Sequence, residues 1–231
     1  MIPPTSIDGT DITGATIDGT DVQEITVDGD VVFSAVEPFN IEDQTFQTSI
    51  NTQASNPEDI AWNDDGSRLY EVGANTEEIY QYTVSTSFDI TSASFSTDIN
   101  AQDGFPTGIA WNNDGSRLYE VGDGSNKIYQ YTVSTSFDIT SASFSTDINT
   151  QDGFPKGIAW NDDGTRLYEI GLGSEKIYQY TVSTPFDITS ASFSTDINTQ
   201  DSAPTGIAWN DDGTRLYEVG NSSDKIYQYT L

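Results

Sequence analysis

Arginine and glutamate recur together at one fixed spacing, and they are the side chains best suited to forming a charged site. Each of the four arginines stands three positions before a glutamate, and successive pairs are 49 residues apart. Guanidinium and carboxylate groups form strong, often bidentate hydrogen bonds. We expect structural ion pairs between successive repeats, with an anion-binding ring as the functional alternative. The set comprises Arg68, Arg117, Arg166 and Arg215 with Glu71, Glu120, Glu169 and Glu218.

Asparagine and aspartate cluster before a glycine once in every repeat, and their oxygens suit a calcium ion. The acidic ligand that closes a calcium loop at its twelfth position is absent. Asp-Gly steps between short β-rich runs are instead typical of hairpin turns. We therefore predict hairpins at Asn63–Gly66, Asn112–Gly115, Asn161–Gly164 and Asn210–Gly213.

Catalytic chemistry has few candidates, because the sequence contains no histidine and no cysteine. The commonest general bases, zinc ligands and thiol nucleophiles are therefore missing. Carboxylates are too numerous for their proximity in the sequence to be informative. We predict a non-enzymatic protein with no catalytic residue, no metal and no cofactor. A lyase or lactonase holding a metal in a central channel is the enzymatic alternative.

Binding residues are better sought where the repeats differ, since loops carry most binding residues. Two loops that differ between repeats stand out: one precedes the first strand of a repeat, and the other joins its second and third strands. From these loops we select Phe105, Phe154, Asn75, Asn126, Glu175 and Asp224. The twelve tyrosines, three in each repeat, are expected to pack in the core. An exposed aromatic platform for sugars is the alternative.

The elements that must position these residues follow from the repeat itself. Four tryptophans mark its period of 49 residues: Trp62, Trp111, Trp160 and Trp209. Each copy contains IAWN, an Asp-Gly turn, RLYE and IYQYT, and the complete copies continue with FDITSASFSTDIN. These short runs are rich in β-branched and aromatic residues. Four strands in a repeat of this length predict an all-β fold, a four-bladed β-propeller.

The ends of the chain suggest how the blades join. The last copy ends at Leu231 without a fourth strand, and Phe39, Ile41 and Phe46 stand 49 residues before Phe88, Ile90 and Phe95. We predict that residues 38–50 supply the missing outer strand and close the ring, so that the propeller spans residues 36–231. Two chains making a larger ring is the alternative.

Residues 1–35 are expected to form a small β appendage. Three ten-residue units follow one another from residue 6, each with an apolar residue before Asp-Gly. So short a segment buries little surface by itself, so we expect it to dock on another protein and to form a homo-oligomeric base. The alternative is an extension that lies on its own propeller.

The acidic composition excludes nucleic acid as a partner and suggests a saline environment. The chain carries 37 acidic and 8 basic residues, for a net charge of −29. Such a surface repels nucleic acid. Molar salt would screen the repulsion among these carboxylates, so we expect a halophilic source. No apolar run suits insertion into a membrane, and no secretory signal is visible at the N-terminus.

The stretch GIAWNDDGTRLYEVGNSSDKIYQYTL, at residues 206–231, resembles propeller repeats of bacteriophage and archaeal-virus structural proteins and of some bacterial surface proteins. Those repeats run GIAF, an Asp-Gly turn, KMYVVG and DKVYQYTLSTPWD, and Ser183–Asp187 matches their last link. TIDGTDVQEITVDGDVVFSA, at residues 16–35, is similar to N-terminal segments of tailed-virus virion proteins, especially haloarchaeal ones. The glutamate of RLYE replaces an aliphatic residue, and those propellers usually have more blades.

This resemblance implies a virion structural protein of a haloarchaeal virus, assembled in the host cytoplasm and located on the virion surface. Residues 1–35 would dock to other virion proteins. The propeller would project as a turret, decoration or fibre head and touch a host-surface glycoprotein or glycan. A secreted or cell-surface binding module of a halophilic microbe is the alternative.

Overall fold

The computed structural model describes residues 16–17, 20–21, 24–27, 30–34, 46–210 and 212–230, in two compact units, Met1–Thr48 and Ser49–Leu231. The first unit contains two antiparallel strand pairs, β1 (Thr16–Ile17) with β2 (Thr20–Asp21) and β3 (Glu24–Val27) with β4 (Asp30–Ser34). Each pair flanks an Asp-Gly step, as the ten-residue units predict. The predicted domain boundary at residues 35–36 lies outside the described residues.

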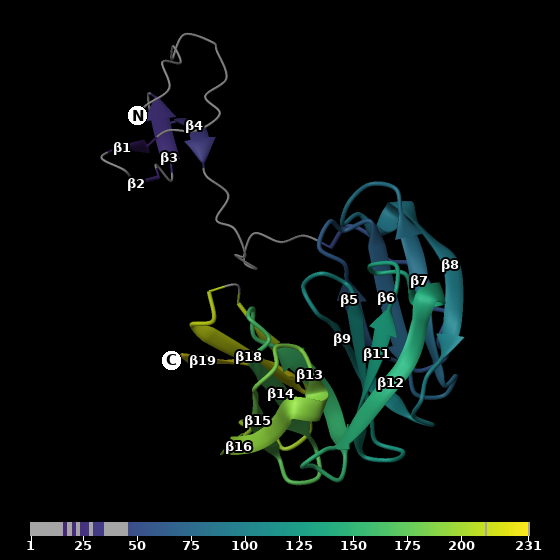
Figure 1. Ribbon diagram of the computed structural model, residues 1–231. Helices are drawn as coiled ribbons and strands as arrows, with labels where there is room; N and C mark the ends of the chain where they lie inside the picture. The colour runs from purple at the N-terminus through teal and green to yellow at the C-terminus, as the bar shows by residue number, and fades with distance from the viewer. Residues whose placement is uncertain are drawn as a thin grey trace. The chain divides into compact units, whose positions relative to one another are not determined.

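The second unit confirms the predicted fold, an all-β four-bladed β-propeller built from the 49-residue repeats (Figure 1). Each blade is an antiparallel sheet whose strands follow chain order from the inner to the outer edge. The first blade has strands β5 (Pro57–Trp62), β6 (Arg68–Gly73), β7 (Glu78–Val84) and β8 (Ala93–Asn100). The second has β9 (Pro106–Trp111), β10 (Arg117–Gly122), β11 (Lys127–Val133) and β12 (Ala142–Asn149).

The third blade has strands β13 (Pro155–Trp160), β14 (Arg166–Gly171), β15 (Lys176–Val182) and β16 (Ala191–Asn198), and the fourth has β17 (Pro204–Trp209), β18 (Arg215–Gly220) and β19 (Lys225–Thr230). A 3₁₀ turn precedes each outer strand: η2 (Ile90–Ser92), η3 (Ile139–Ser141) and η4 (Ile188–Ser190). In the described part of the chain, no helix is long and apolar enough to cross a membrane.

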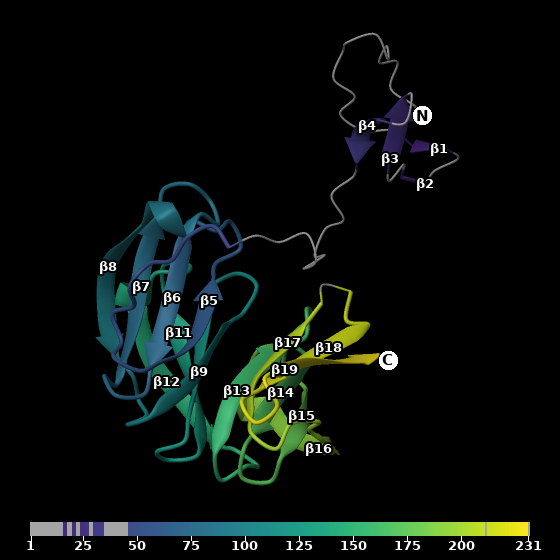
Figure 2. The ribbon, with the colours of Figure 1, turned by 180° about the vertical axis from the view of Figure 1, so that it is seen from behind.

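The outer strand predicted at residues 38–50 falls mostly outside the described residues. The described part, residues 46–50, forms no strand, and the fourth sheet contains three strands among the described residues. The first and fourth blades lie at opposite ends of the series (Figure 2).

Hairpin turns at the Asp-Gly steps are confirmed, and the second blade shows why the sequence forms them. Gly115 adopts a φ of +68°, which glycine tolerates without a steric penalty. The side-chain oxygens are used within the turn itself. Asn112 accepts from the Arg117 N–H at 2.9 Å, and Asp114 accepts from the Ser116 N–H at 2.9 Å.

The hydrophobic core lies between successive blades. Tyr70, Val72 and Ile79 of the first blade pack against Ile109 and Leu118 of the second. The same positions meet between the second and third blades. Burying one such side chain contributes roughly 1.5–3 kcal/mol, so these junctions hold neighbouring blades together.

Candidate binding site

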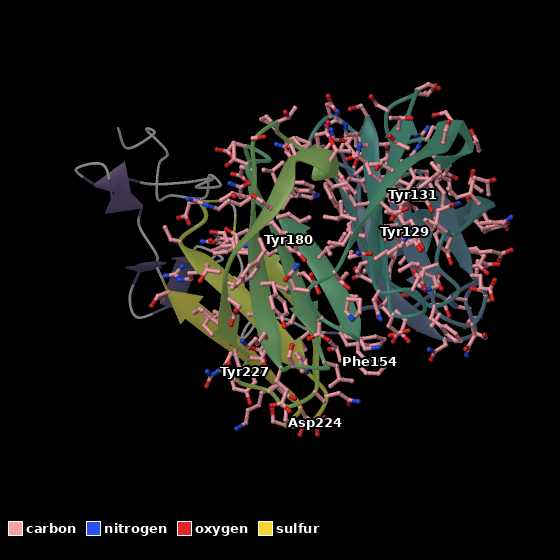
Figure 3. All side chains as sticks on the ribbon, turned by 60° about the horizontal axis from the view of Figure 1, so that its bottom comes forward. Tyr129, Tyr131, Phe154, Tyr180, Asp224 and Tyr227 are labelled. Carbon is pink, nitrogen blue, oxygen red and sulfur yellow. The ribbon has the colours of Figure 1, made fainter. Side chains whose placement is uncertain are left out.

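Two loops of each blade lie together at one end of its sheet, and we call this end the loop rim. One loop enters the inner strand, and the other joins the second and third strands. The Asp123 N–H donates to the Phe105 carbonyl at 3.1 Å, and the Leu172 N–H donates to the Phe154 carbonyl at 2.9 Å. Figure 3 shows Phe154 and Asp224 at this edge of the propeller. The rim therefore combines the two loops that differ most between repeats.

A buried aspartate fixes the loops of the rim. Asp152 accepts from the N–H groups of Phe154, Gly173 and Ser174 at 2.7, 2.8 and 2.9 Å, and from the Ser174 hydroxyl. Burial opposes its ionisation, but these donors bring the pKa of Asp152 below its usual range. Asp103 and Asp201 repeat the arrangement. The first blade has Ala54 at this position.

Exposed apolar side chains on the rim occur in the two middle blades. Phe105 is 52% exposed, Phe154 is 56% exposed and Leu172 is 37% exposed. We call these three residues the rim patch. The first and fourth blades carry Asn56 and Ala203 where the middle blades carry phenylalanine. Leu172, which the sequence prediction did not select, lies directly beside Phe154 through their backbone hydrogen bond.

The other four predicted binding residues lie in the turns of the rim. Asn126, Glu175 and Asp224 have φ values of 57°, 56° and 54°. The left-handed region is uncommon outside glycine, so these residues shape the turn backbone. The Asn126 carbonyl also accepts from the Thr150 N–H at 3.0 Å. Asn75 is exposed in the corresponding turn of the first blade.

The predicted arginine–glutamate ion pairs are wrong for the described residues. The fully buried Glu120 turns back to its own blade, where it accepts from the N–H groups of Gln102 and Asp103 at 2.9 and 2.8 Å. Tyr131 donates its hydroxyl to the same carboxylate. Burial raises the pKa of Glu120, although these donors oppose the rise. Corresponding bonds are made by Glu71, Glu169 and Glu218.

Arginine instead donates to a main-chain carbonyl of the next blade. Arg117 reaches the Pro185 oxygen at 3.1 Å, and Arg68 reaches the Ser136 oxygen at 3.3 Å. The ion pairs of the described residues belong to lysine: Lys127–Asp147, Lys156–Asp123 and Lys176–Asp196. The pairs do not form because the glutamate carboxylate is already bonded inside its own blade, by two backbone N–H groups and a tyrosine hydroxyl.

Tyrosine packing in the core is confirmed for most of the repeat positions. Nine tyrosines of the first three blades are buried: Tyr70, Tyr80, Tyr82, Tyr119, Tyr129, Tyr131, Tyr168, Tyr178 and Tyr180. Eight of these hydroxyls, all except that of Tyr168, have a hydrogen-bond partner among the described residues, such as the Ser125 hydroxyl for Tyr129 at 2.5 Å. Buried tyrosines offer no platform to a sugar ring.

An open slot of about 280 Å³ separates the turns of the third and fourth blades, lined by Arg166, Tyr168, Trp209 and Gly213, among others. Between the second and third blades, Phe186 fills the corresponding space. Its ring lies 5.3 Å from that of Trp160. The slot therefore lies where a phenylalanine equivalent to Phe186 would stand, and no described phenylalanine occupies it.

Metal binding has no candidate within residues 46–210 and 212–230, where no three acidic side chains are grouped so as to hold an ion. The turn aspartates are already used by backbone donors, as in the Asp114 turn. The rim patch is the exposed apolar feature of the loops in the two middle blades.

No family model and no curated protein matches the chain. Solved structures do match it. A functionally unknown protein from Desulfotomaculum acetoxidans has a TM-score of 0.57 at 14% identity, over 77% of this chain and 55% of that one. A putative 6-phosphogluconolactonase from Bacteroides fragilis has a TM-score of 0.57 at 12% identity, over 75% and 50%.

The periplasmic gluconolactonase of Pseudomonas aeruginosa is also similar, with a TM-score of 0.54 at 12% identity over 74% of this chain and 48% of that one. At such identities the likeness shows the propeller fold alone. The chain spans about half the length of these solved structures. Some of the similar propellers are thus named as enzymes, while others are not.

Proposed function

We propose that this protein is a virion structural protein of a haloarchaeal virus that projects from the particle surface. Residues 1–35 dock to other virion proteins, and the propeller binds a host-surface glycoprotein through the rim patch. The resemblance of residues 206–231 and 16–35 to virus structural proteins supports this role. The net charge of −29 supports a saline environment.

The observation that carries the binding role is the exposure of Phe105 and Phe154 on loops that are held in place. A large aromatic side chain that is half exposed contributes binding energy when a partner covers it. The aspartate beneath each loop fixes the backbone from which the ring projects. A rigid anchor loses little conformational entropy on binding.

The proposal assigns no catalytic step to the chain. Two similar structures are named as lactonases, but they are only 12% identical to this chain. Such a similarity shows a shared fold and not a shared chemistry. Metal analysis of the purified protein tests the enzymatic alternative, because a lactonase or lyase of this fold would hold one tight divalent ion per chain. We expect no stoichiometric metal.

Location is tested by immunogold electron microscopy with antibodies against the full chain. Labelling is expected on purified virus particles. Labelling of host cells in the absence of particles would contradict the virion role and support the cell-surface alternative.

Binding is tested separately, with fluorescently labelled full-length protein and intact haloarchaeal cells in molar salt. The double variant Phe105→Ser/Phe154→Ser is expected to lose at least about tenfold in affinity, as the loss of a hot spot of about 1.4 kcal/mol would give. Phe144→Ser is the matched control, because Phe144 is 46% exposed on an outer strand. Equal binding by the double variant and the control would overturn the role of the rim patch.

A further inference from the structure

The contact between successive blades has two unlike halves. We call them the arginine face and the phenylalanine face. At the first junction, the arginine face of the first blade presents Arg68 and Gln81. Arg68 donates to the Ser136 carbonyl of the second blade at 3.3 Å, and Gln81 accepts from the Ile139 N–H at 3.1 Å. The phenylalanine face at this junction belongs to the second blade and includes Phe137, whose main-chain carbonyl accepts a hydrogen bond from the Tyr70 hydroxyl.

The next junction repeats these contacts. Arg117 donates to the Pro185 carbonyl at 3.1 Å, and Gln130 accepts from the Ile188 N–H at 3.0 Å. The apolar residues at its centre are almost fully covered. Val121 and Ile128 of the arginine face are 0% exposed, and Ile158 of the phenylalanine face is 5% exposed. One specific interface therefore recurs along the chain.

Among the described residues, each end of the blade series presents one half of this interface without the other half. The fourth blade exposes its arginine face, where Val219 is 42% and Ile226 is 68% exposed. The first blade exposes its phenylalanine face, where Ile60 is 60% and Phe88 is 57% exposed. Ile109, the counterpart of Ile60 in the second blade, is only 4% exposed.

The two exposed faces match each other, because they repeat residues that already pack together inside the chain. Val219 and Ile226 repeat Val121 and Ile128, and Ile60 repeats Ile158. Among the described residues the inner strands pack in series, β5 on β9, β9 on β13 and β13 on β17, with no comparable packing of β5 on β17. Figures 1 and 2 show these blades at opposite ends of the series.

We propose that a second copy of this chain covers both faces, with the fourth blade of each copy packing on the first blade of the other. The chain spans 55% and 50% of two solved structures that it matches, so two copies together have about the length of one such chain. A head-to-tail interface that returns to its start after two copies makes a closed dimer. This inference does not depend on the proposed function.

The test is the mass of the full-length protein in molar salt, measured by light scattering. We expect twice the chain mass of 25.2 kDa. Val219→Glu/Ile226→Glu and, separately, Ile60→Glu are expected to halve the mass, because each places charge in one face. Phe144→Glu is the control, since Phe144 is 46% exposed outside both faces and should leave the dimer intact. Far-ultraviolet circular dichroism checks that each variant retains its β-structure.

Mixing the two monomeric variants distinguishes a head-to-tail contact from a symmetric one. Each variant keeps one unaltered face, so the mixture regains one interface and part of the dimer. A wild-type monomer at every concentration measured would overturn the proposal. So would a dimer that survives either set of face substitutions.

Discussion

Tyr131 donates its hydroxyl hydrogen to the carboxylate of Glu120, and both side chains are buried within the second blade. The same carboxylate accepts from the backbone N–H groups of Gln102 and Asp103. One side chain thus links two adjacent strands to the loop that enters the inner strand. The pair recurs in every blade, as Tyr82–Glu71, Tyr180–Glu169 and Tyr229–Glu218.

Removing this carboxylate should destabilise the propeller strongly. Glu120→Ala removes the acceptor of the Tyr131 hydroxyl and of the buried Asp103 N–H, and one of the two acceptors of the Gln102 N–H. We therefore expect the free energy of unfolding to fall by about 3 kcal/mol. Tyr131→Phe should cost about 1 kcal/mol, because it removes the hydroxyl's bonds to Glu120 and Gln102 but leaves both backbone N–H groups bonded to the carboxylate. Urea titration in molar salt measures both. A loss for Glu120→Ala no larger than that for Tyr131→Phe would show that the backbone bonds contribute little.

Asp59 should make the propeller more stable in mild acid than at neutral pH. Its carboxylate accepts from the N–H groups of Ile109 and Ile60 at 3.0 and 2.8 Å. Burial nevertheless raises the pKa of Asp59 from 3.8 to about 6. A raised pKa means that the folded state favours the protonated group. Its stabilising contribution is therefore complete below pH 3.8 and is lost as the pH rises through 6.

Asp59→Asn isolates this effect from the other carboxylates. At pH 7.5 we expect the variant to be more stable than wild type by about 1 kcal/mol, and the difference should vanish towards pH 4. The second, third and fourth blades have glycine at this position, so Asp59→Gly is a useful control. A stability difference that does not change with pH would show that Asp59 keeps an ordinary pKa when folded.

The fold and two of the three rim-patch residues could be predicted from the sequence, whereas the partners of the buried glutamates could not. A period of 49 residues, with Asp-Gly turns such as Asp114-Gly115, determines the strands and their order. The partner of Glu120 is a matter of side-chain direction and burial, which spacing does not give. The exposure of Phe105 and Phe154 agrees with their selection as repeat-breaking residues. The turn geometry of Asn126 was hidden because no repeat has glycine at this left-handed position; the other blades have Glu77, Glu175 and Asp224.

Asp152 should be needed to hold the rim loops of the third blade in one conformation. Replacing it with alanine removes the acceptor for three N–H groups, so we expect a loss of about 2 kcal/mol in unfolding free energy and weaker binding of haloarchaeal cells through Phe154. The pKa of Asp152 is lowered in the folded state. Its stabilisation is therefore present above its unfolded pKa and is lost as the pH falls through the folded value.

Hydrogen exchange at Gly173 and Ser174 provides the direct measurement for this variant. Faster exchange is expected at both amides in Asp152→Ala, with unchanged exchange at the matching loop of the second blade, where Asp103 remains. Unchanged protection at Gly173 and Ser174 would show that the loop is held by other contacts.

Salt should stabilise the propeller, and part of that effect should be traceable to one carboxylate. Asp64 is largely exposed, but the partial loss of its hydration raises its pKa. The negative charges of Asp65 and of Asp114 in the next blade raise the pKa of Asp64 further. Ionised Asp64 is thus repelled by its neighbours in dilute buffer, and molar salt shortens the screening length from about 10 Å at 0.1 M to about 3 Å. The second blade has Asn113 at this position, where its amide donates to the Asp162 carbonyl at 2.6 Å.

Asp64→Asn should therefore raise the melting temperature in dilute buffer and change it little in molar potassium chloride. Betaine, which is neutral overall, controls for effects of solutes other than screening. Differential scanning calorimetry at low and high salt measures the two shifts. If Asp64→Asn raised the melting temperature equally in both buffers, salt would not stabilise the protein by screening the repulsion on Asp64. A wild-type melting temperature that is independent of salt would contradict the halophilic interpretation of the acidic surface, because screening is the physical basis of that interpretation.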